Sequence, residues 1–80
     1  VLGRQNRRKE AVLSEVARVT EISARSTESF EEAVRVGVER ATQTLRGVQS
    51  AWVKEQQVTV DGEGHIAEYQ VNLMVTFVLD

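Results

Sequence analysis

The last part of the chain carries its clearest hydrophobic pattern. Between residues 67 and 79, apolar side chains alternate with mostly polar ones, and a period of two is typical of a β-strand. The apolar positions are Ala67, Tyr69, Val71, Leu73, Val75, Phe77 and Leu79. Because strands average about five or six residues, we expect this long strand to curve around a packing partner and to run past it toward neighbouring subunits.

A helical pattern comes earlier in the chain. Apolar residues spaced three or four apart form one stripe, made of Phe30, Val34, Val38, Ala41 and Leu45. Ser26 offers an N-cap hydroxyl at the start of this segment. Three glutamates, Glu28, Glu31 and Glu32, then place negative charge where a helix dipole favours it. Gly47 is expected to end the helix in a left-handed cap.

Two further strands complete the predicted fold. Residues 16–24 are rich in β-branched side chains, and residues 51–60 form a second strand-like stretch. The sequence "DGEG" at 61–64 predicts a turn, since two glycines can adopt positive φ. The predicted order is β-α-β-β, an α+β fold in which one helix covers one face of a small, mostly antiparallel three-stranded sheet.

Length and composition limit how such a fold can be stabilised. Eighty residues make one domain with a thin core, because a chain of this size buries only about 60% of its unfolded surface. The chain has no cysteine and one histidine, which excludes disulfides and thiolate or histidine-rich zinc sites. We therefore expect self-association to supply the missing stability.

Net charge gives no indication of a nucleic-acid or membrane partner. The formal net charge is -2, and no apolar run approaches the roughly 18 residues of a membrane span. No signal-peptide pattern is visible. We expect a soluble, cytoplasmic protein.

Residues 1–15 differ from the remainder of the chain and form a basic N-terminal extension. Four cations lie close together there, namely Arg4, Arg7, Arg8 and Lys9. An arm for an anionic partner is one interpretation, but the segment has no aromatic side chains for stacking on bases. A solvated tail or a short docking helix is the preferred interpretation.

The single tryptophan, Trp52, can face either side of the sheet. One register of the last two strands pairs Val60 with His65 and turns Trp52 toward the helix as a core residue. The other register pairs Val60 with Ile66, or reaches the same result through a bulge. It places Trp52 opposite Met74 on the face that the helix leaves uncovered, where apolar area usually marks an interaction site. The pattern alone leaves both open.

Catalytic chemistry is not apparent in the sequence. His65, the only histidine, lies at a turn edge, and the "DGEG" glycines are too few and too close for a nucleotide loop. Asp61 and Glu63 could offer oxygens to calcium or magnesium, but two carboxylates fall short of the six to eight ligands that calcium takes. We therefore expect a binding or storage module and not an enzyme.

Several stretches together resemble the dodecin family. They are "STESFEEAV" at the helix start, "ERATQTL" at its end, "VKE" in the second strand and "EYQVNLMVTFVLD" in the last strand. The resemblance covers residues 16–80, expected to form a dodecin-like domain, and leaves 1–15 outside. It implies a hollow homododecamer without enzymatic activity that stores or buffers flavins such as riboflavin or FMN.

The resemblance also implies which residues bind the flavin. In flavin-binding members, one strand tryptophan from each of two subunits sandwiches a pair of isoalloxazine rings. A glutamine just after the last strand's tyrosine forms a hydrogen bond with the ring edge. Here these residues are Trp52 and Gln70. A gapless alignment through "TLRGVQSAWVKE" places the family's tryptophan at Ser50, so Trp52 lies about 7 Å further along the same face. The alternative is a cage of the same fold that binds divalent cations, calcium or magnesium, or is purely structural.

Overall fold

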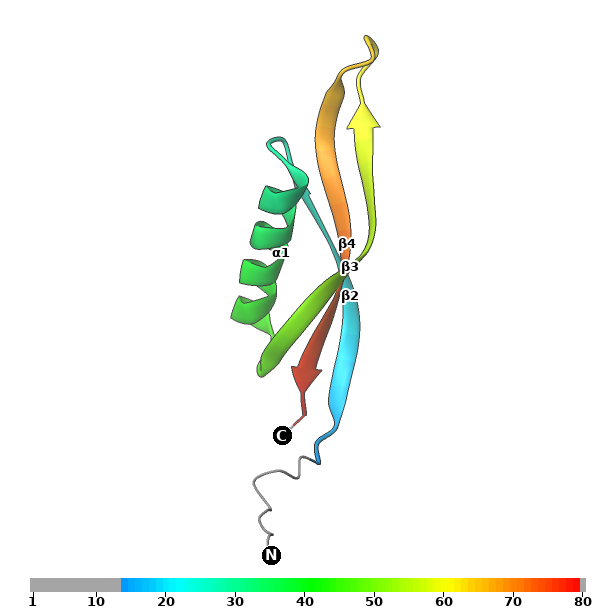
Figure 1. Ribbon diagram of the computed structural model, residues 1–80. Coiled ribbons are helices and arrows are strands. Elements are labelled where there is room, and N and C mark those ends of the chain that lie inside the picture. Colours follow the sequence, from blue (N-terminus) through cyan, green and yellow to red (C-terminus); the bar gives the residue numbers. More distant parts are fainter. Residues whose placement is uncertain (1–13, 80) are drawn as a thin grey trace, which may run out of the picture.

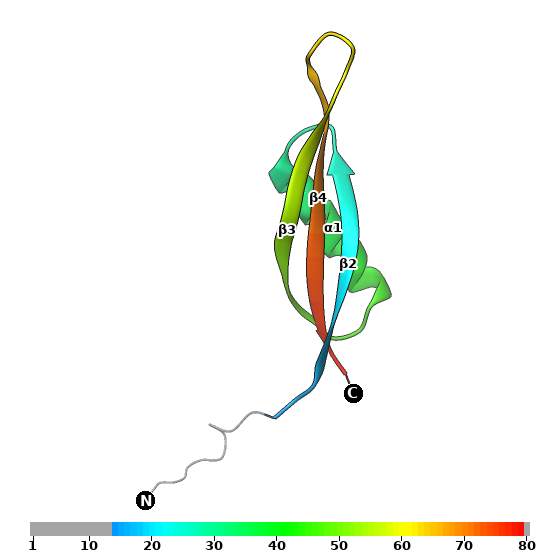
Figure 2. The ribbon, with the colours of Figure 1, turned by 90° about the vertical axis from the view of Figure 1, so that its right-hand side faces the viewer.

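The structure, a computed structural model, describes residues 14–79. Strand β2 (Ala17–Ser26) is followed by helix α1 (Phe30–Thr44), strand β3 (Val48–Val60) and strand β4 (Ile66–Val78). The three strands form one antiparallel sheet in the order β2-β4-β3, and α1 lies across one of its faces (Figures 1 and 2). The predicted β-α-β-β fold is confirmed.

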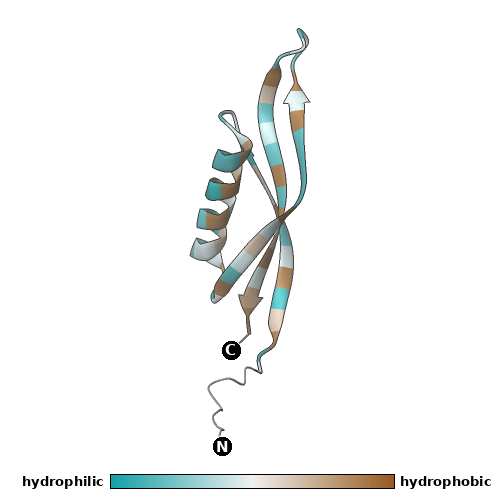
Figure 3. Ribbon diagram, in the orientation of Figure 1, coloured by the Kyte–Doolittle hydropathy of each residue, from teal (hydrophilic) through white to brown (hydrophobic). Residues whose placement is uncertain are grey.

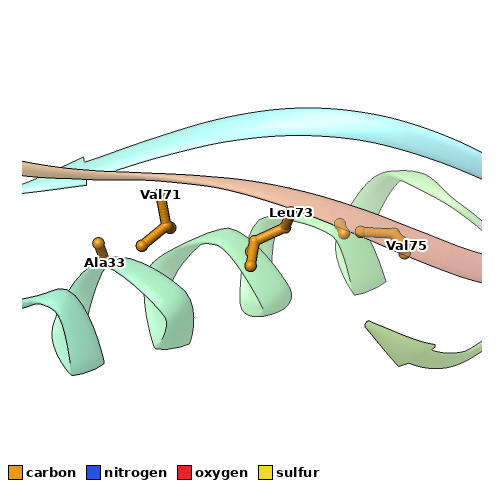
Figure 4. Packing of buried hydrophobic residues seen from close by; sticks show 5 residues of the cluster. Ala33, Val71, Leu73 and Val75 are labelled. Atoms are coloured by element: carbon orange, nitrogen blue, oxygen red, sulfur yellow. The ribbon is translucent and has the colours of Figure 1, made fainter. Parts of the chain in front are cut away.

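Strand β4 is the centre of both the sheet and the core. It pairs with β2 on one side and β3 on the other, and its alternation directs every second side chain toward α1. Val71, Leu73 and Val75 are at most 1% exposed and pack against Ala33 and Ala41 of the helix (Figure 4). These five residues are the fully buried core of the described chain, so the core is as thin as the length predicts.

The helix begins three residues later than the sequence suggests. Ser29 is the N-cap, and its hydroxyl accepts a hydrogen bond from the Glu32 backbone N–H at 2.9 Å. Ser26 is instead the last residue of β2, opposite Tyr69, and its hydroxyl accepts the N–H of Glu28 in the connecting turn. The predicted N-cap at Ser26 is wrong because pairing with β4 holds that residue in the sheet.

Gly47 does have positive φ (73°), but it does not cap the helix. The helix ends at Thr44, with Leu45 as an extended C-cap residue. Gly47 lies in the connection to β3, where its carbonyl accepts the N–H of Val78 at 3.0 Å. A Cβ at this position would lie 3.0 Å from the Val78 carbonyl oxygen, so close approach of two backbones explains the glycine.

Small residues line the part of α1 that lies nearest the sheet. The buried positions are Ala33, Gly37 and Ala41, while the larger residues of the predicted stripe are only partly buried beside them. A Cβ on Gly37 would lie 2.8 Å from Leu73 Cδ1 and 3.1 Å from the Ala24 Cβ. The helix therefore packs against the sheet at a distance that only small side chains permit.

The β3–β4 hairpin runs past the end of α1, as expected from the length of the last strand (Figure 1). Figure 3 shows hydrophobic positions at its far end, where Val58, Val60 and Ile66 are exposed. The turn is held by Asp61, whose Oδ1 accepts the backbone N–H groups of Glu63 (2.8 Å) and His65 (3.0 Å). These two hydrogen bonds lower the pKa of Asp61.

No helix in the part of the chain that the structure describes has the length and apolar character needed to cross a membrane. The basic cluster between Arg4 and Lys9 lies outside the described residues, as does all of residues 1–13.

Replacing Gly37 by alanine tests the close packing of helix and sheet. We expect Gly37→Ala to lower the free energy of unfolding by about 1 kcal/mol, because the cost of overpacking exceeds the gain in helix propensity. Gly62→Ala is the matched control, since nothing lies within 4 Å of a Cβ there. Denaturant unfolding at one protein concentration gives both values. A Gly37→Ala protein as stable as the Gly62→Ala protein would contradict this packing.

We expect the hairpin turn to become less stable at acidic pH. Because the pKa of Asp61 is lowered in the folded state, its carboxylate stabilises the turn above the ordinary aspartate pKa of about 3.9. This contribution is lost as the pH falls through the folded-state value. An NMR titration of the Asp61 side chain should have its midpoint below about 3.9, and Asp61→Asn should remove the acid-dependent shift of the Glu63 and His65 amides. A titration midpoint of Asp61 at or above about 3.9 would contradict a role of these hydrogen bonds in lowering its pKa.

Candidate functional site

Among residues 14–79, no helix lies on one face of the sheet, and Figure 2 views the molecule from this side. We call it the open face. Residues opposite each other in an antiparallel pair share a face, so the neighbours of the non-core positions of β4 belong to it. Its members are Ala17, Val19, Glu21, Ser23 and Arg25 of β2, Ser50, Trp52, Glu55, Gln57, Thr59 and Val60 of β3, and Ile66, Glu68, Gln70, Asn72, Met74, Thr76 and Val78 of β4.

Trp52 lies on the open face. It is opposite Met74 in the β3–β4 pairing, and 51% of its surface is exposed. Of the two registers that the sequence permits, the structure has the one with Val60 opposite Ile66. The core interpretation of Trp52 is therefore wrong, and the tryptophan is a surface aromatic. Ser50 lies on the same face, opposite Thr76, as the displacement by two residues predicts.

Bulges in the β3–β4 pairing determine which side chains reach the open face. The register shifts between Val53 and Glu55, so Lys54 has no partner on β4. Before the bulge Val53 lies opposite Leu73 on the helix side, and after it Glu55 lies opposite Asn72 on the open face. A continuous ladder would have turned Glu55 toward the helix. The bulge thus keeps the charged side chains of β3 out of the core.

A polar network crosses the open face next to Trp52. Lys54 Nζ donates to Glu21 Oε1 at 3.1 Å, which links β3 to β2 across the central strand. Asn72 Nδ2 donates to Glu55 Oε1 at 3.2 Å and to Glu21 Oε2 at 3.4 Å. Gln70 Nε2 donates to Asn72 Oδ1 at 3.2 Å. The network orients the Gln70 amide and leaves its carbonyl oxygen available to a ligand, since no protein donor in the described chain bonds to it.

Trp52 and Gln70 share the open face but do not touch. Trp52 is opposite Met74, and Met74 is four residues from Gln70 along β4, which corresponds to about 13 Å of strand. Met74 and Asn72 are therefore nearer to the Trp52 row than Gln70 is.

The alternation of β4 in the sequence predicts that Met74 and Asn72 share the face of Gln70, and the structure confirms it. Gln57 was not predicted to lie on this face. Gln57 lies directly opposite Gln70, but only through the bulge at Lys54. A bulge depends on contacts between distant strands, so no local signal predicted this pair of amides.

The carboxylates of the hairpin turn have a structural explanation. Asp61 Oδ1 accepts two backbone N–H groups, which is the geometry of an Asx turn. His65 Nδ1 lies 3.7 Å from Asp61 Oδ2 and 3.7 Å from Glu63 Oε1, and all three side chains are well exposed. Within residues 14–79 no three histidine, cysteine or acidic side chains are grouped in a way that could hold a metal ion.

Hollows flank the helix on both sides. One of about 460 Å³ lies between α1 and β2, bordered by Val36 and Gly37, and Val36 is 40% exposed. Another of about 370 Å³ lies between α1 and β3, bordered by Val34, Val38 and Val53. Both leave apolar side chains uncovered in a single subunit.

Comparison with known proteins identifies relatives of the same fold. A family model described as Dodecin matches residues 16–80. The dodecin from Streptomyces davaonensis is 37% identical, with a TM-score of 0.79 and coverage of 85% of this chain and 98% of that one. The tt0972 protein from Thermus thermophilus is 36% identical, with a TM-score of 0.76 and coverage of 84% and 97%.

A third relative is described by a different ligand. The calcium dodecin from Mycobacterium tuberculosis, a calcium-chelating antigen with a novel calcium-binding site, is 34% identical. Its TM-score is 0.71, and the match covers 81% of this chain and 91% of that one. No curated protein sequence gives a significant match. The family model covers the whole described sheet and helix, and on this ground the chain belongs to the dodecin family.

Proposed function

We propose that this is a cytoplasmic, non-enzymatic protein that binds flavins and stores or buffers them, with the flavin ring stacked on Trp52 between the open faces of two subunits. The observation that carries the proposal is the position of Trp52. It is half-exposed on a sheet face that no helix covers, with Met74 opposite it and a network of amides and carboxylates beside it.

Assembly of subunits supports this placement. Membership of the dodecin family goes with assembly into a hollow homo-oligomer, and we propose twelve subunits. The thin core and the exposed apolar side chains of the open face and the hairpin, among them Val19, Trp52, Val58, Val60 and Ile66, favour burial against further copies. In such an assembly Trp52 would lie at a junction between subunits.

Stacking explains why a tryptophan suits this position. Its large flat π-system favours offset stacking on another planar ring, which contributes about 0.5–1.5 kcal/mol beyond simple area burial. A primary amide can both donate to and accept from a ring edge. Because Gln70 is about four strand residues from the Trp52 row, or about 13 Å, we propose that the Gln70 amide on a given ring comes from a different subunit than the tryptophan on which that ring stacks.

The chain's only histidine supports a binding role in preference to catalysis. His65 lies at the hairpin turn with 73% of its side chain exposed, and its nearest charged neighbours are Asp61 and Glu63 at 3.7 Å. Such an exposed group lacks the water-excluding surroundings in which an acid–base residue is tuned.

Replacing Trp52 tests the stacking directly. We expect Trp52→Ala to weaken riboflavin binding by about tenfold or more, because two stacking contacts are lost for each ring sandwich. Trp52→Phe should have an intermediate effect, since a smaller ring remains. The measurement is quenching of riboflavin fluorescence, with size-exclusion chromatography to verify that the oligomer is unchanged.

Tyr69→Phe is the control for this experiment. Tyr69 lies on the helix side, and its ring centroid is 5.1 Å from that of Phe30. The substitution therefore changes an aromatic residue without altering the open face. Its riboflavin affinity should equal that of the unmodified protein. Equal affinity of the Trp52→Ala and Tyr69→Phe proteins would exclude stacking on Trp52.

A divalent-cation store of the same fold is the second candidate, and the calcium-chelating relative favours it. The two proposals differ in which ligand stabilises the folded protein. A ligand at 100 times its Kd adds about 2.7 kcal/mol of stability, so we expect riboflavin to raise Tm and calcium or magnesium to leave it unchanged. Thermal melts of the metal-free protein with each ligand decide between them. A rise with calcium alone would favour the cation store.

A further inference from the structure

The charges of the open face bear on which flavin it can accept. Three carboxylates, Glu21, Glu55 and Glu68, lie on this face, together with the guanidinium of Arg25. The ammonium group of Lys54 belongs to it as well, because it bonds to Glu21. Three negative and two positive groups leave each open face with an excess of one negative charge.

Both cations of the open face already have carboxylate partners. Lys54 Nζ lies 3.1 Å from Glu21 Oε1, and Arg25 lies 3.9 Å from Glu68 Oε1. Glu55 accepts a hydrogen bond from the Asn72 amide, but no cation of the described chain lies within ion-pair distance of it. A phosphate on this face would have to displace a carboxylate from its cation or lie near Glu55 without compensation.

Assembly would increase the excess of negative charge around a bound flavin. If a flavin ring stacks between the open faces of two copies related by a two-fold axis, each face contributes the same residues and the negative excess doubles. Water is partly excluded between the subunits, so charge repulsion there is stronger than in bulk solvent. The phosphate of FMN carries about -1.5 to -2 charges near pH 7.

Uncharged hydroxyl groups, by contrast, match what the open face offers. Gln57, Gln70 and Asn72 present primary amides, and Ser23 and Thr76 present hydroxyls. These groups can donate to or accept from the hydroxyls of a ribityl chain without any charge. The polar part of the face is therefore suited to the side chain of riboflavin and lacks an available cation for its phosphate.

We infer that the site selects the phosphate-free flavin, riboflavin, over FMN, and that Glu55 is a main determinant of this selectivity. The inference rests on the proposed flavin-binding function and specifies its ligand. Glu55 acts by its charge, since an uncharged residue of the same shape could accept the same hydrogen bond from Asn72.

The experiment compares two ligands on three proteins. Riboflavin and FMN are each titrated at low ionic strength by flavin fluorescence, against the unmodified protein, Glu55→Gln and Glu31→Gln. Glutamine at position 55 keeps an acceptor for Asn72 and removes the charge. Glu31→Gln is the matched control, because it removes the same charge from the exposed side of α1, away from the open face.

We expect the unmodified protein and Glu31→Gln to bind riboflavin about fivefold or more tightly than FMN, a ratio that added salt should reduce. Glu55→Gln should tighten FMN binding by a larger factor than it changes riboflavin binding, and so narrow the ratio. FMN binding as tight as riboflavin binding would overturn the inference and leave the flavin function standing. Identical ratios for Glu55→Gln and Glu31→Gln would overturn the role of Glu55. Absence of binding by either flavin would overturn the proposed function itself.

Discussion

Between Val53 and Glu55, strand β3 contains one residue more than β4 can pair with, and the side chains of β3 exchange faces at that point. Before this bulge, Val53 faces the helix and Trp52 faces away from it. After the bulge, Gln56 and Val58 lie on the helix side of the sheet, whereas Glu55 and Gln57 lie on the open face. Either continuous register would direct a charged side chain, Lys54 or Glu55, toward α1, and the bulge avoids this. The proposed flavin site depends on the bulge, because it brings Trp52, Glu55 and Gln57 onto one face.

The second constraint lies on the helix side of the sheet, where a single helix has to bury the core. Ala33, Gly37 and Ala41 let α1 lie close to β4, but one helix of this length covers only part of the sheet. The hairpin extends past the helix with exposed apolar side chains, and no element of residues 14–79 covers the open face. Large unburied apolar surface is costly in water, so the same features that make the subunit marginal alone favour assembly. A ligand site between subunits follows from this arrangement.

Local patterns were sufficient to predict the fold. The alternation from Ala67 to Leu79 predicts β4, and the apolar stripe from Phe30 to Leu45 predicts α1, because both reflect one-sided burial. The N-cap was predicted at Ser26 instead of Ser29, since the sequence offers two serines and only the pairing of Ser26 with β4 distinguishes them.

The site was less accessible to prediction than the fold. The sequence left the face of Trp52 open, because it depends on the register of β3 against β4, which no local pattern reveals. The contact of Lys54 with Glu21 joins residues 33 positions apart and emerges only from the strand order β2-β4-β3. The family resemblance correctly indicated dodecin and drew attention to Trp52 and Gln70, whose flavin-binding role stays a proposal. Gln70 lies four residues along β4 from Met74, the partner of Trp52, and this separation was visible only in the structure.

The central claim is that a pair of flavin rings lies between the Trp52 side chains of two subunits. A crystal structure of the assembled protein with riboflavin tests it most directly. We expect electron density for two isoalloxazine rings, each stacked on Trp52 of one copy, with Met74 and Asn72 beside it and a Gln70 amide at its edge. Density for the ring at any other surface, or an ordered Trp52 packed directly against a neighbouring subunit with no room for a ring, would contradict it.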